Sequence, residues 1–508
     1  MYDGGEAAEA DNSGKAEGLW WLSQETAGMQ SGARLGGDLM NDSRALETTD
    51  PASFSTTTPN ARTALLSEAA RNAIDYLVGE DERPVAPRPE AIEALNVLRE
   101  PLPTGPTDAE TVLQLLSEYG SKATVAKTGG RNFGFVNGGC LPAALAASWL
   151  VSAWDQNAAF FVQSPTAIVL EEIALEWTRE LLGLPVGTGG AVVTGATMAN
   201  LTALAAARHA LLARAGWDVE ADGLQGAPPI TVVVGDEVHA SVLKALGLLG
   251  LGRKTAVRVP VDGQGRMRAD AMPDLDERTI LCVQAGNVNT GAFDPATEIV
   301  PRAKELGVWV HVDGAFGLWA ATSPNYRNLT EGFALADSWA TDAHKWPNIG
   351  YDCGIALVRD PDALRAAMSI QASYLALGEH REPSDYNPEL SRRARGVELW
   401  AGLRSLGRSG MAEIVERTSS HARRFAEGLR TAGFAVLNDV VINQVLVDFG
   451  SPEKTLRTIA RIQAEGTCWC GSTVWQGKTA MRISVSSWAT SVEDVERSLA
   501  AMLKAAED

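Results

Sequence analysis

The segment Ala-Asp-Ser-Trp-Ala-Thr-Asp-Ala-His-Lys-Trp-Pro-Asn, residues 336–348, places a His-Lys pair directly before a Trp-Pro break. Its first half predicts a short buried strand over residues 338–341, so Lys345 follows that strand's carboxyl end. Upstream, Trp-Val-His-Val-Asp-Gly-Ala-Phe, residues 309–316, predicts a second buried strand that ends on Asp313. A lysine and an aspartate therefore follow two buried strands, which we expect to be neighbours in one sheet.

Short apolar strands alternate with helical segments through the middle of the chain. Further strands are expected at 191–194, 230–234, 279–284 and 354–358. This alternation predicts an α/β fold with a mostly parallel sheet covered by helices on both faces. Ligands of such sheets bind at the carboxyl ends of the strands. The polar residues at or just past these ends are Thr197, His239, Asn287, Asp313, His344 and Lys345.

Lys345 and Asp313 form the pair of groups that a pyridoxal phosphate (PLP) enzyme requires. The lysine amine forms a Schiff base, and the carboxylate keeps the pyridinium nitrogen protonated so that the ring accepts electrons. A buried carboxylate is costly unless a charged hydrogen-bond donor pairs with it. By itself, His311-Val-Asp313 could equally be half of a metal site or a helix cap.

The turn Gly195-Ala196-Thr197 leads from a predicted strand into a predicted helix. Small residues let the backbone approach an anion, and the free N–H groups of a helix N-terminus favour a phosphate. Small residues also pack a helix against a strand in many α/β proteins, so this pattern alone is weak.

His239 follows the strand predicted at 230–234. Alone, it could be a structural histidine that caps the next helix; in a PLP site, its imidazole would lie flat against the ring. Thr341 and His344 could donate to the phosphate. Ala315 would supply a flat floor beneath the ring if the strand that ends on Asp313 continues.

The composition excludes several classes of partner. The 508 residues carry a formal net charge of −19, which argues against binding nucleic acid or an anionic membrane. The N-terminus lacks the pattern of a signal peptide, and the longest apolar stretch, 141–154, is too short to span a bilayer. An odd count of five scattered cysteines predicts reduced thiols in a cytoplasmic protein, and Cys468 and Cys470 are expected to be buried side chains without a metal.

Four regions are predicted along the chain. Residues 1–55 have the composition of a disordered tail, and residues 56–140 form an N-terminal helical arm. Residues 141–398 form the large cofactor-binding domain, and residues 399–508 form a smaller α/β domain. In this smaller domain a helix is expected at 412–432 and strands are expected at 441–447 and 481–485.

The ordered motifs resemble the group II PLP-dependent amino acid decarboxylases of fold type I, which include the aromatic L-amino acid, glutamate, histidine and diaminobutyrate enzymes. The resemblance covers most of residues 63–505. It is carried by Thr-Gly-Ala-Thr-Met-Ala-Asn-Leu (194–201), His239, Gly-Asn-Val-Asn-Thr-Gly-Ala-Phe-Asp (286–294), His-Val-Asp-Gly-Ala-Phe-Gly (311–317) and Asp-Ala-His-Lys (342–345).

The resemblance implies a role for each matching residue. Lys345 would be the internal aldimine, Asp313 the pyridinium partner, and His239 the residue that stacks on the ring. Ala196, Thr197 and His344 would bind the phosphate, and Asn287 stands where relatives often place a threonine near the ring hydroxyl. Arg482 matches an arginine that binds a substrate carboxylate in some relatives, although it could equally form a surface ion pair.

Two regions depart from the family pattern. The family's mobile loop, which delivers a proton-donating tyrosine, corresponds here to residues 378–391, where Tyr386 is the only tyrosine; the loop is a few residues shorter than in the aromatic enzymes. Many members carry His-Pro ahead of the aromatic segment of the substrate pocket, and this chain has Gly-Gly-Arg-Asn-Phe-Gly-Phe, residues 129–135. Phe135 would make that wall apolar, which favours an aromatic or aliphatic substrate.

The predicted function is decarboxylation of an L-amino acid to its amine by a homodimeric PLP enzyme, with Tyr386 or His239 returning the proton. The alternatives are another PLP reaction on the same fold, namely transamination, aldehyde-forming oxidation or carbon–carbon lyase chemistry, and a non-catalytic relative that binds PLP.

Overall fold

The computed structural model describes residues 59–370 and 380–507. The tail predicted for residues 1–55 lies outside the described residues. Residues 58–508 form one compact unit. Among the described residues, no helix has both the length and the apolar character needed to cross a membrane.

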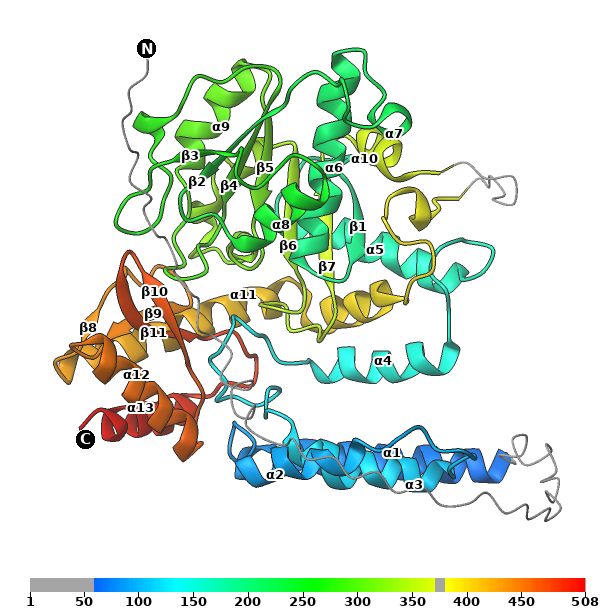
Figure 1. Cartoon of the computed structure of the whole chain (residues 1–508), viewed down its shortest axis with the longest axis vertical. Coiled ribbons are helices and arrows are strands. Elements are labelled where there is room, and N and C mark those ends of the chain that lie inside the picture. Colours follow the sequence, from blue (N-terminus) through cyan, green and yellow to red (C-terminus); the bar gives the residue numbers. More distant parts are fainter. Residues whose placement is uncertain (1–58, 371–379, 508) are drawn as a thin grey trace, which may run out of the picture. The chain divides into compact units, whose positions relative to one another are not determined.

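A seven-stranded sheet organises the larger part of the fold (Figure 1). Its order is β1-β7-β6-β5-β4-β2-β3, and only β7 runs antiparallel to its neighbours. The predicted α/β fold with a mostly parallel sheet is therefore confirmed. The strands are β1 Gly189–Val193, β2 Thr231–Gly235, β3 Val257–Val259, β4 Thr279–Gln284, β5 Trp309–Asp313, β6 Ser338–Asp342 and β7 Gly354–Val358.

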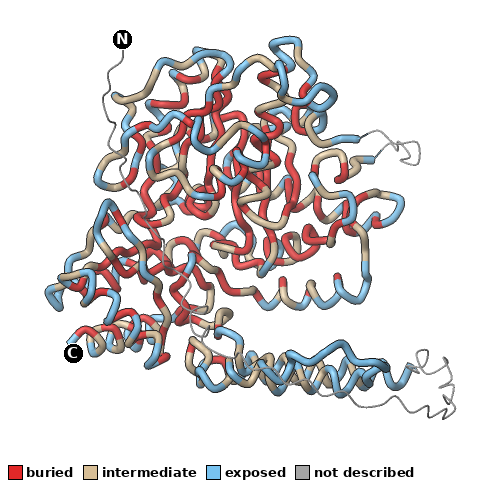
Figure 2. The backbone as a smooth tube through the Cα atoms, in the orientation of Figure 1, coloured by how far each residue is buried: buried red, intermediate tan, exposed pale blue. Residues whose placement is uncertain are grey.

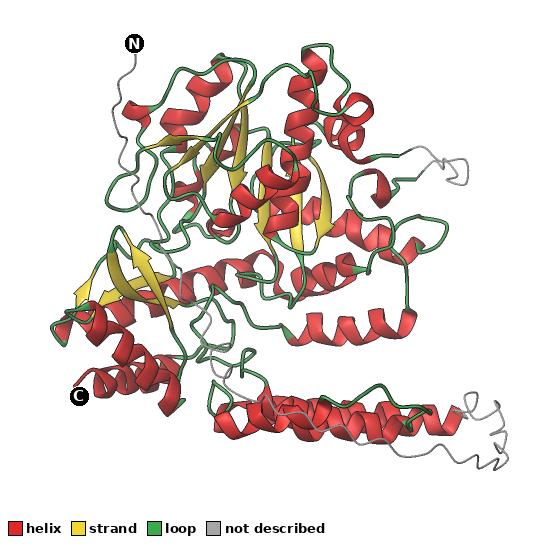
Figure 3. Ribbon diagram, viewed as in Figure 1, coloured by secondary structure: helices red, strands yellow, loops and turns green. Residues whose placement is uncertain are grey.

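Helices pack against this sheet because its central strands are apolar on both faces (Figure 3). The large buried clusters contain side chains of both faces, and burial is densest around the strands (Figure 2). The helices of this part are α4 Pro142–Trp154, α5 Pro165–Leu181, α6 Ala196–Arg214, α7 Val219–Asp222, α8 Ala240–Leu248, α9 Ala296–Glu305 and α10 Pro361–Met368.

A second, antiparallel sheet has the order β10-β11-β9-β8. A cluster that includes Phe425, Ile462 and Met502 joins this sheet to its helices. Cys468 and Cys470 are free and buried in the same cluster, and the described residues contain no group of His, Cys, Asp or Glu suited to a metal. The elements are α11 Arg395–Thr431, β8 Ala435–Val436, β9 Gln444–Asp448, α12 Pro452–Glu465, β10 Gly471–Trp475, β11 Lys478–Ser484 and α13 Val492–Glu507.

Helix α11 begins earlier than the helix predicted from residue 412, and it contains a kink at Gly407, where φ is +60°. The hairpin of β10 and β11 was predicted only in its second strand. Three N-terminal helices, α1 Pro59–Val78, α2 Pro89–Ala94 and α3 Ala109–Leu115, contain no buried residue. The domain boundaries expected at residues 140 and 398 stay predictions.

Candidate active site

A cavity of about 290 Å³ lies at the carboxyl ends of the central strands. Five of the predicted site residues line it together, although they come from three separate stretches of the chain. These residues are Ala196, Thr197, His239, His344 and Lys345. Thr194, Gly195, Met198, Ser241 and Asp342 complete the lining.

Lys345 lies in a tight turn after β6, and its Nζ is 2.9 Å from Oδ2 of Asp342. The turn is closed by the amide of Asn348, which donates to the Lys345 carbonyl at 3.1 Å. A Cβ on Gly138 would lie only 1.9 Å from that carbonyl oxygen, so glycine is required for this close approach. The lysine backbone is therefore held by contacts from a segment some 200 residues upstream.

Asn348 connects three segments around this turn. Its Oδ1 accepts from the backbone N–H groups of Gly139 and Trp488, and its Nδ2 donates to the carbonyls of Trp346 and Ser486. The residue is fully buried with φ at +59°, a conformation that asparagine tolerates better than most residues. Sequence reasoning missed Asn348, because a hub of long-range hydrogen bonds leaves no local pattern.

Asp313 ends β5 with its side chain almost fully buried. Its Oδ1 accepts from the amide of Ala315 at 3.3 Å, whereas Oδ2 has no hydrogen-bond partner among the described residues. Burial raises the pKa of this carboxyl, and the nearby His239 and Lys345 oppose the rise. An unpaired oxygen on a buried carboxyl needs a donor, and a protonated pyridine nitrogen supplies a charge-assisted one.

His239 caps helix α8 and also lines the cavity. Its stacking on the cofactor ring stays a prediction. Its Nδ1 accepts from the amide of Ser241 at 3.2 Å and lies 2.7 Å from the Ser241 hydroxyl. Burial lowers the pKa of the imidazole, with Lys345 and Arg482 acting in the same direction. A neutral imidazole therefore faces the cavity near neutral pH.

The N-terminus of α6 is suited to a phosphate. Gly195 precedes the helix, and a Cβ there would meet Cε1 of His344 at 3.1 Å. Nδ1 of His344 accepts from the amide of Cys353 at 3.2 Å, so the proton of the neutral ring resides on Nε2. Thr341 adds a buried hydroxyl that has no hydrogen-bond partner in the described part of the chain. Free helical N–H groups and these side chains together match an anionic oxygen cluster.

Arg482 on β11 is partly buried and has no carboxylate partner among the described residues. Its Nη1 donates to Oδ1 of Asn289 at 3.3 Å and to the carbonyl of Val288 at 3.4 Å. Burial lowers the pKa of this guanidinium to about 10. A partly buried arginine without an acidic partner is available for a bound anion.

Asn287 and Ala315 are not among the described residues that line the cavity. The side chain of Asn287 shapes its own turn, because Oδ1 accepts from the amides of Asn289 and Thr290 while Nδ2 donates to Gln284. Ala315 donates its amide to Asp313. Their assigned contacts with the cofactor stay predictions.

Phe135 and Tyr386 do not line the cavity within the described part of the chain. Phe135 is 67 % exposed and stacks on Trp469 with ring centroids 5.2 Å apart. Tyr386 packs against a cluster that includes Val193 and Ala340, with the Arg381 guanidinium 4.4 Å from its ring centre. Their predicted roles are not tested by these positions.

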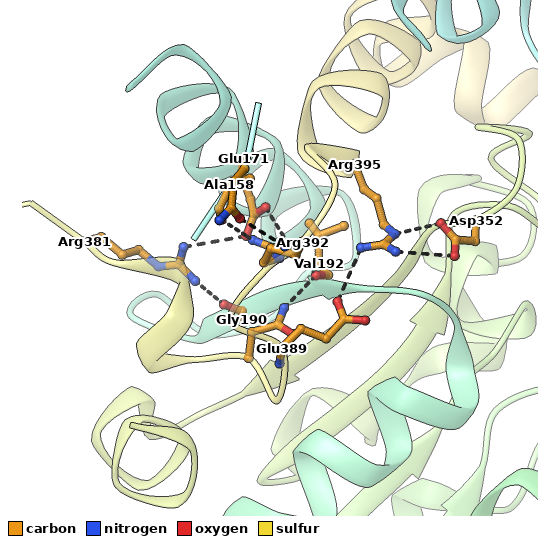
Figure 4. A network of polar contacts seen from close by, with 11 residues as sticks. Ala158, Glu171, Gly190, Val192, Asp352, Arg381, Glu389, Arg392 and Arg395 are labelled. Atoms are coloured by element: carbon orange, nitrogen blue, oxygen red, sulfur yellow. Dashed lines mark hydrogen bonds and ion pairs between the residues drawn. The ribbon is translucent and has the colours of Figure 1, made fainter. Parts of the chain in front are cut away.

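The segment around Tyr386 is fixed by a network of buried charges (Figure 4). Nη2 of Arg392 lies 2.9 Å from Oε2 of Glu171 and donates to the Val192 carbonyl on β1 at 2.6 Å. Arg395 pairs with Asp352 at 2.7 Å, which joins the start of α11 to the loop after Lys345. The charges of this network are matched by partners of opposite sign or by carbonyls.

Tyr351 is a second residue that sequence reasoning missed. Its ring stacks on His344 with centroids 4.2 Å apart, and the ammonium of Lys127 lies 3.3 Å from the ring centre. Its hydroxyl donates to Oδ1 of Asn137 at 2.6 Å. The Tyr351 ring therefore covers one face of His344. No local sequence pattern predicts this contact.

Comparison with known proteins agrees with this geometry. The family model described as the pyridoxal-dependent decarboxylase conserved domain matches residues 104–449. The chain belongs to this family. PLP is therefore its cofactor, and the unpaired Asp313 oxygen, the α6 N-terminus and Lys345 fit that group.

Among the family's curated members, aromatic-L-amino-acid decarboxylase of Drosophila lebanonensis is 30 % identical over 379 residues, 68 % of this chain and 91 % of the relative. L-2,4-diaminobutyrate decarboxylase of Acinetobacter baumannii is 26 % identical over 389 residues, 70 % of this chain and 76 % of the relative. The structure of Oryza sativa TDC with PLP and tryptamine superposes with a TM-score of 0.81 at 23 % identity, covering 89 % of this chain and 99 % of that one. This last likeness shows the shared fold.

Proposed function

We propose that this protein decarboxylates an L-amino acid to the corresponding amine and carbon dioxide, with Lys345 as the residue that binds the cofactor aldehyde covalently. The observation that carries the proposal is the cavity in which Lys345, the unpaired Asp313 carboxyl nearby and the α6 N-terminus converge. Bound PLP supplies an electron sink for the pair of electrons released when a bond at Cα breaks.

Asp342 would orient Lys345 in the cavity. Its carboxylate is almost fully buried and lies 2.9 Å from Nζ. The same carboxylate lies 3.6 Å from Nε2 of His344. One buried carboxylate therefore faces both the lysine and the imidazole that line the cavity.

Three groups would bind the phosphate: the backbone at Ala196, the hydroxyl of Thr197 and Nε2–H of His344. The lining of the cavity by all three residues supports this role. Asp313 would hold the pyridinium nitrogen, and His239 would cover one face of the ring with Ala315 beneath the other.

Arg482 would bind the carboxylate of the substrate. A partly buried guanidinium without an acidic partner is costly, and a substrate carboxylate removes that cost. Holding this group fixes which Cα bond stands perpendicular to the ring and therefore which bond breaks. Phe135, exposed and stacked on Trp469, would offer an aromatic surface to an apolar side chain.

The proton that replaces carbon dioxide at Cα would come from His239 or Tyr386. We favour His239, because it lines the cavity. Tyr386 packs against the cluster formed by Ala191, Val193, Ala199, Ala340 and Ala356 instead.

The functional unit would be a cytoplasmic homodimer. Helices α1, α2 and α3 have no buried residue, and α1 and α3 expose large apolar side chains such as Leu66, Ile74 and Val112. Exposed apolar faces of this extent favour a partner surface. Light scattering coupled to size-exclusion chromatography tests the dimer, and an active monomer would contradict it.

The decisive test is a panel of L-amino acids offered to the purified holoenzyme, with carbon dioxide, amine, aldehyde and keto acid all measured. Equal amounts of amine and carbon dioxide are expected. Keto acid without carbon dioxide would establish transamination, aldehyde would establish oxidative chemistry, and PLP binding without turnover would establish a non-catalytic relative.

A further inference from the structure

We propose that a buried hydrogen-bond chain through Ser338, His311, Asn200 and Ser241 determines which ring nitrogen of His239 carries the proton. Asn200 and Ser241 thereby become positioning residues for the cavity. The inference deepens the proposed function, on which its catalytic meaning rests.

This hydrogen-bond chain runs from the central sheet, through Asn200 of α6, to the N-terminus of α8. In the sheet, Trp309 Nε1 lies 2.9 Å from Ser338 Oγ, which lies 2.9 Å from His311 Nδ1. His311 Nε2 lies 2.8 Å from Asn200 Oδ1, Asn200 Nδ2 lies 3.1 Å from Ser241 Oγ, and Ser241 Oγ lies 2.7 Å from His239 Nδ1. All members except His239 are buried, at 6 % exposure or less. In such surroundings every donor needs an acceptor.

The direction of the chain is settled at its His239 end. The backbone N–H of Ser241 points at His239 Nδ1, and a backbone amide can only donate, so Nδ1 is an acceptor. The Ser241 hydroxyl lies 2.7 Å from the same nitrogen, and two lone pairs at that distance would repel each other. The hydroxyl hydrogen therefore also points at Nδ1.

Each earlier contact then follows from the one after it. With its hydrogen used, Ser241 Oγ accepts from the amide nitrogen of Asn200, which leaves the Asn200 oxygen to accept from Nε2–H of His311. Burial lowers the pKa of His311 to about 3, so that ring is neutral and its Nδ1 accepts from the Ser338 hydroxyl.

The far end of the chain agrees with this direction independently. Ser338 Oγ also receives Nε1–H of Trp309, and an indole nitrogen can only donate. No contact therefore pairs two donors or two acceptors. A single direction satisfies the chain from end to end.

The consequence is a neutral His239 with its proton on Nε2. No hydrogen bond joins this nitrogen to another protein group in the described part of the chain, and the residue lines the cavity. The charged groups that act on the ring are Asp313, Lys345, Arg482 and Asp342. The cavity therefore receives a ring N–H hydrogen-bond donor at a fixed place.

The test uses holoenzyme labelled with [15N]histidine, in which His239 is the signal missing from a His239→Gln variant. The nitrogen shifts report the tautomer and its pKa directly, without reference to turnover. The wild type is expected to carry the neutral proton on Nε2. Ser241→Ala removes one donor to Nδ1, so the pKa of His239 is expected to rise by about 0.7 pH unit.

Asn200→Asp reverses one contact, because a carboxylate accepts the Ser241 hydroxyl hydrogen that His239 otherwise receives. Its pKa rise is expected to exceed that of Ser241→Ala, since the added negative charge also favours imidazolium. Thr202→Val is the matched control: Thr202 is buried on the same helix, its hydroxyl has no hydrogen-bond partner among the described residues, and His239 should titrate as in the wild type.

A wild-type proton on Nδ1 overturns the proposal, whatever the variants do. So does a Ser241→Ala or Asn200→Asp protein in which His239 titrates unchanged. The tautomer is measured without substrate, so the proposal on the hydrogen-bond chain still holds if decarboxylation is not the reaction. Conversely, carbon dioxide release with the proton on Nδ1 would support the proposed function and refute only the hydrogen-bond chain.

Discussion

Two clusters of buried charge lie in this protein, and they differ in how their carboxylates are paired. Around Glu171, the carboxylate forms ion pairs with the guanidiniums of Arg392 and Arg381, at 2.9 and 3.8 Å (Figure 4). Around Lys345, Asp342 pairs with the lysine, whereas the buried carboxyl of Asp313 has no ion pair and keeps an oxygen without a hydrogen-bond partner among the described residues. The charge of Glu171 is balanced within the chain, whereas that of Asp313 can be balanced by a ligand.

The difference separates structure from chemistry. A fully paired buried network stabilises a fold because removing one member strands the other. An unpaired buried carboxyl costs stability in the free protein and is retained where a bound group completes it. The paired cluster should therefore respond to mutation in stability, and the unpaired cluster in activity.

The largest effect is expected from Lys345→Ala. Without an amine, the cofactor has no covalent attachment, so turnover should fall below detection. Borohydride reduction of the holoenzyme followed by peptide mass spectrometry should place the cofactor on Lys345 in the wild type only. A variant that keeps full turnover would refute the site.

Asp313→Asn should lower kcat by about 10²–10³-fold, because the neutral amide cannot hold the pyridinium proton. The cofactor-free protein should gain about 1–3 kcal/mol in its free energy of unfolding at pH 7. Burial raises the pKa of Asp313 above its value in the unfolded chain. The free energy of unfolding of the wild type therefore falls as the pH rises from the unfolded pKa through the folded pKa, whereas that of the asparagine variant does not. Denaturant unfolding at pH 4 and pH 7 measures the gain, which should vanish at the lower pH.

Glu171→Gln should lower stability and leave kcat nearly unchanged. The substitution leaves Arg392 buried without its counter-ion, so the free energy of unfolding should fall by about 3–5 kcal/mol. At a temperature where the variant stays folded, kcat should remain close to the wild-type value. A large loss of kcat with unchanged stability would show that the comparison between the clusters is wrong.

The acid limb of kcat/KM should report His239. Burial lowers the pKa of this imidazole below its ordinary 6.5, so the neutral ring persists until the pH falls under that value. The profile should therefore decline only below pH 6.5. In His239→Gln the decline should disappear together with most of the activity, and an unchanged limb would assign it to another group.

The smallest effect is expected from Tyr386→Phe, because the ring packs against the cluster with Val193 and under Arg381 and is not among the described residues that line the cavity. A change in kcat of less than about tenfold is expected, below the usual contribution of a general acid. The kcat of a Tyr374→Phe variant is measured beside it, because Tyr374 belongs to residues 371–379, which lie outside the described part of the chain. A loss of 10²-fold or more in Tyr386→Phe would restore it as the proton donor.

Local patterns carried much of the prediction. The apolar run before Asp342-Ala-His-Lys345 and the run that ends on Asp313 gave two adjacent strands, and β5 and β6 are indeed hydrogen-bonded neighbours. The turn before α6 was located because small residues mark a helix N-terminus. The length of α11 was underestimated, since a buried helix that continues past a glycine kink depends on packing rather than on periodicity.

The sequence by itself determined the fold class, the family and the residues that follow the strands, because strand periodicity and helix starts are written in neighbouring residues. Only the tertiary structure decided that Asn348 ties Gly139 to Trp488, that Tyr351 stacks on His344, and that Asn200 links His311 to Ser241. Most of these contacts join residues tens to hundreds of positions apart, and a hydrogen bond between distant groups imposes no spacing on the chain between them.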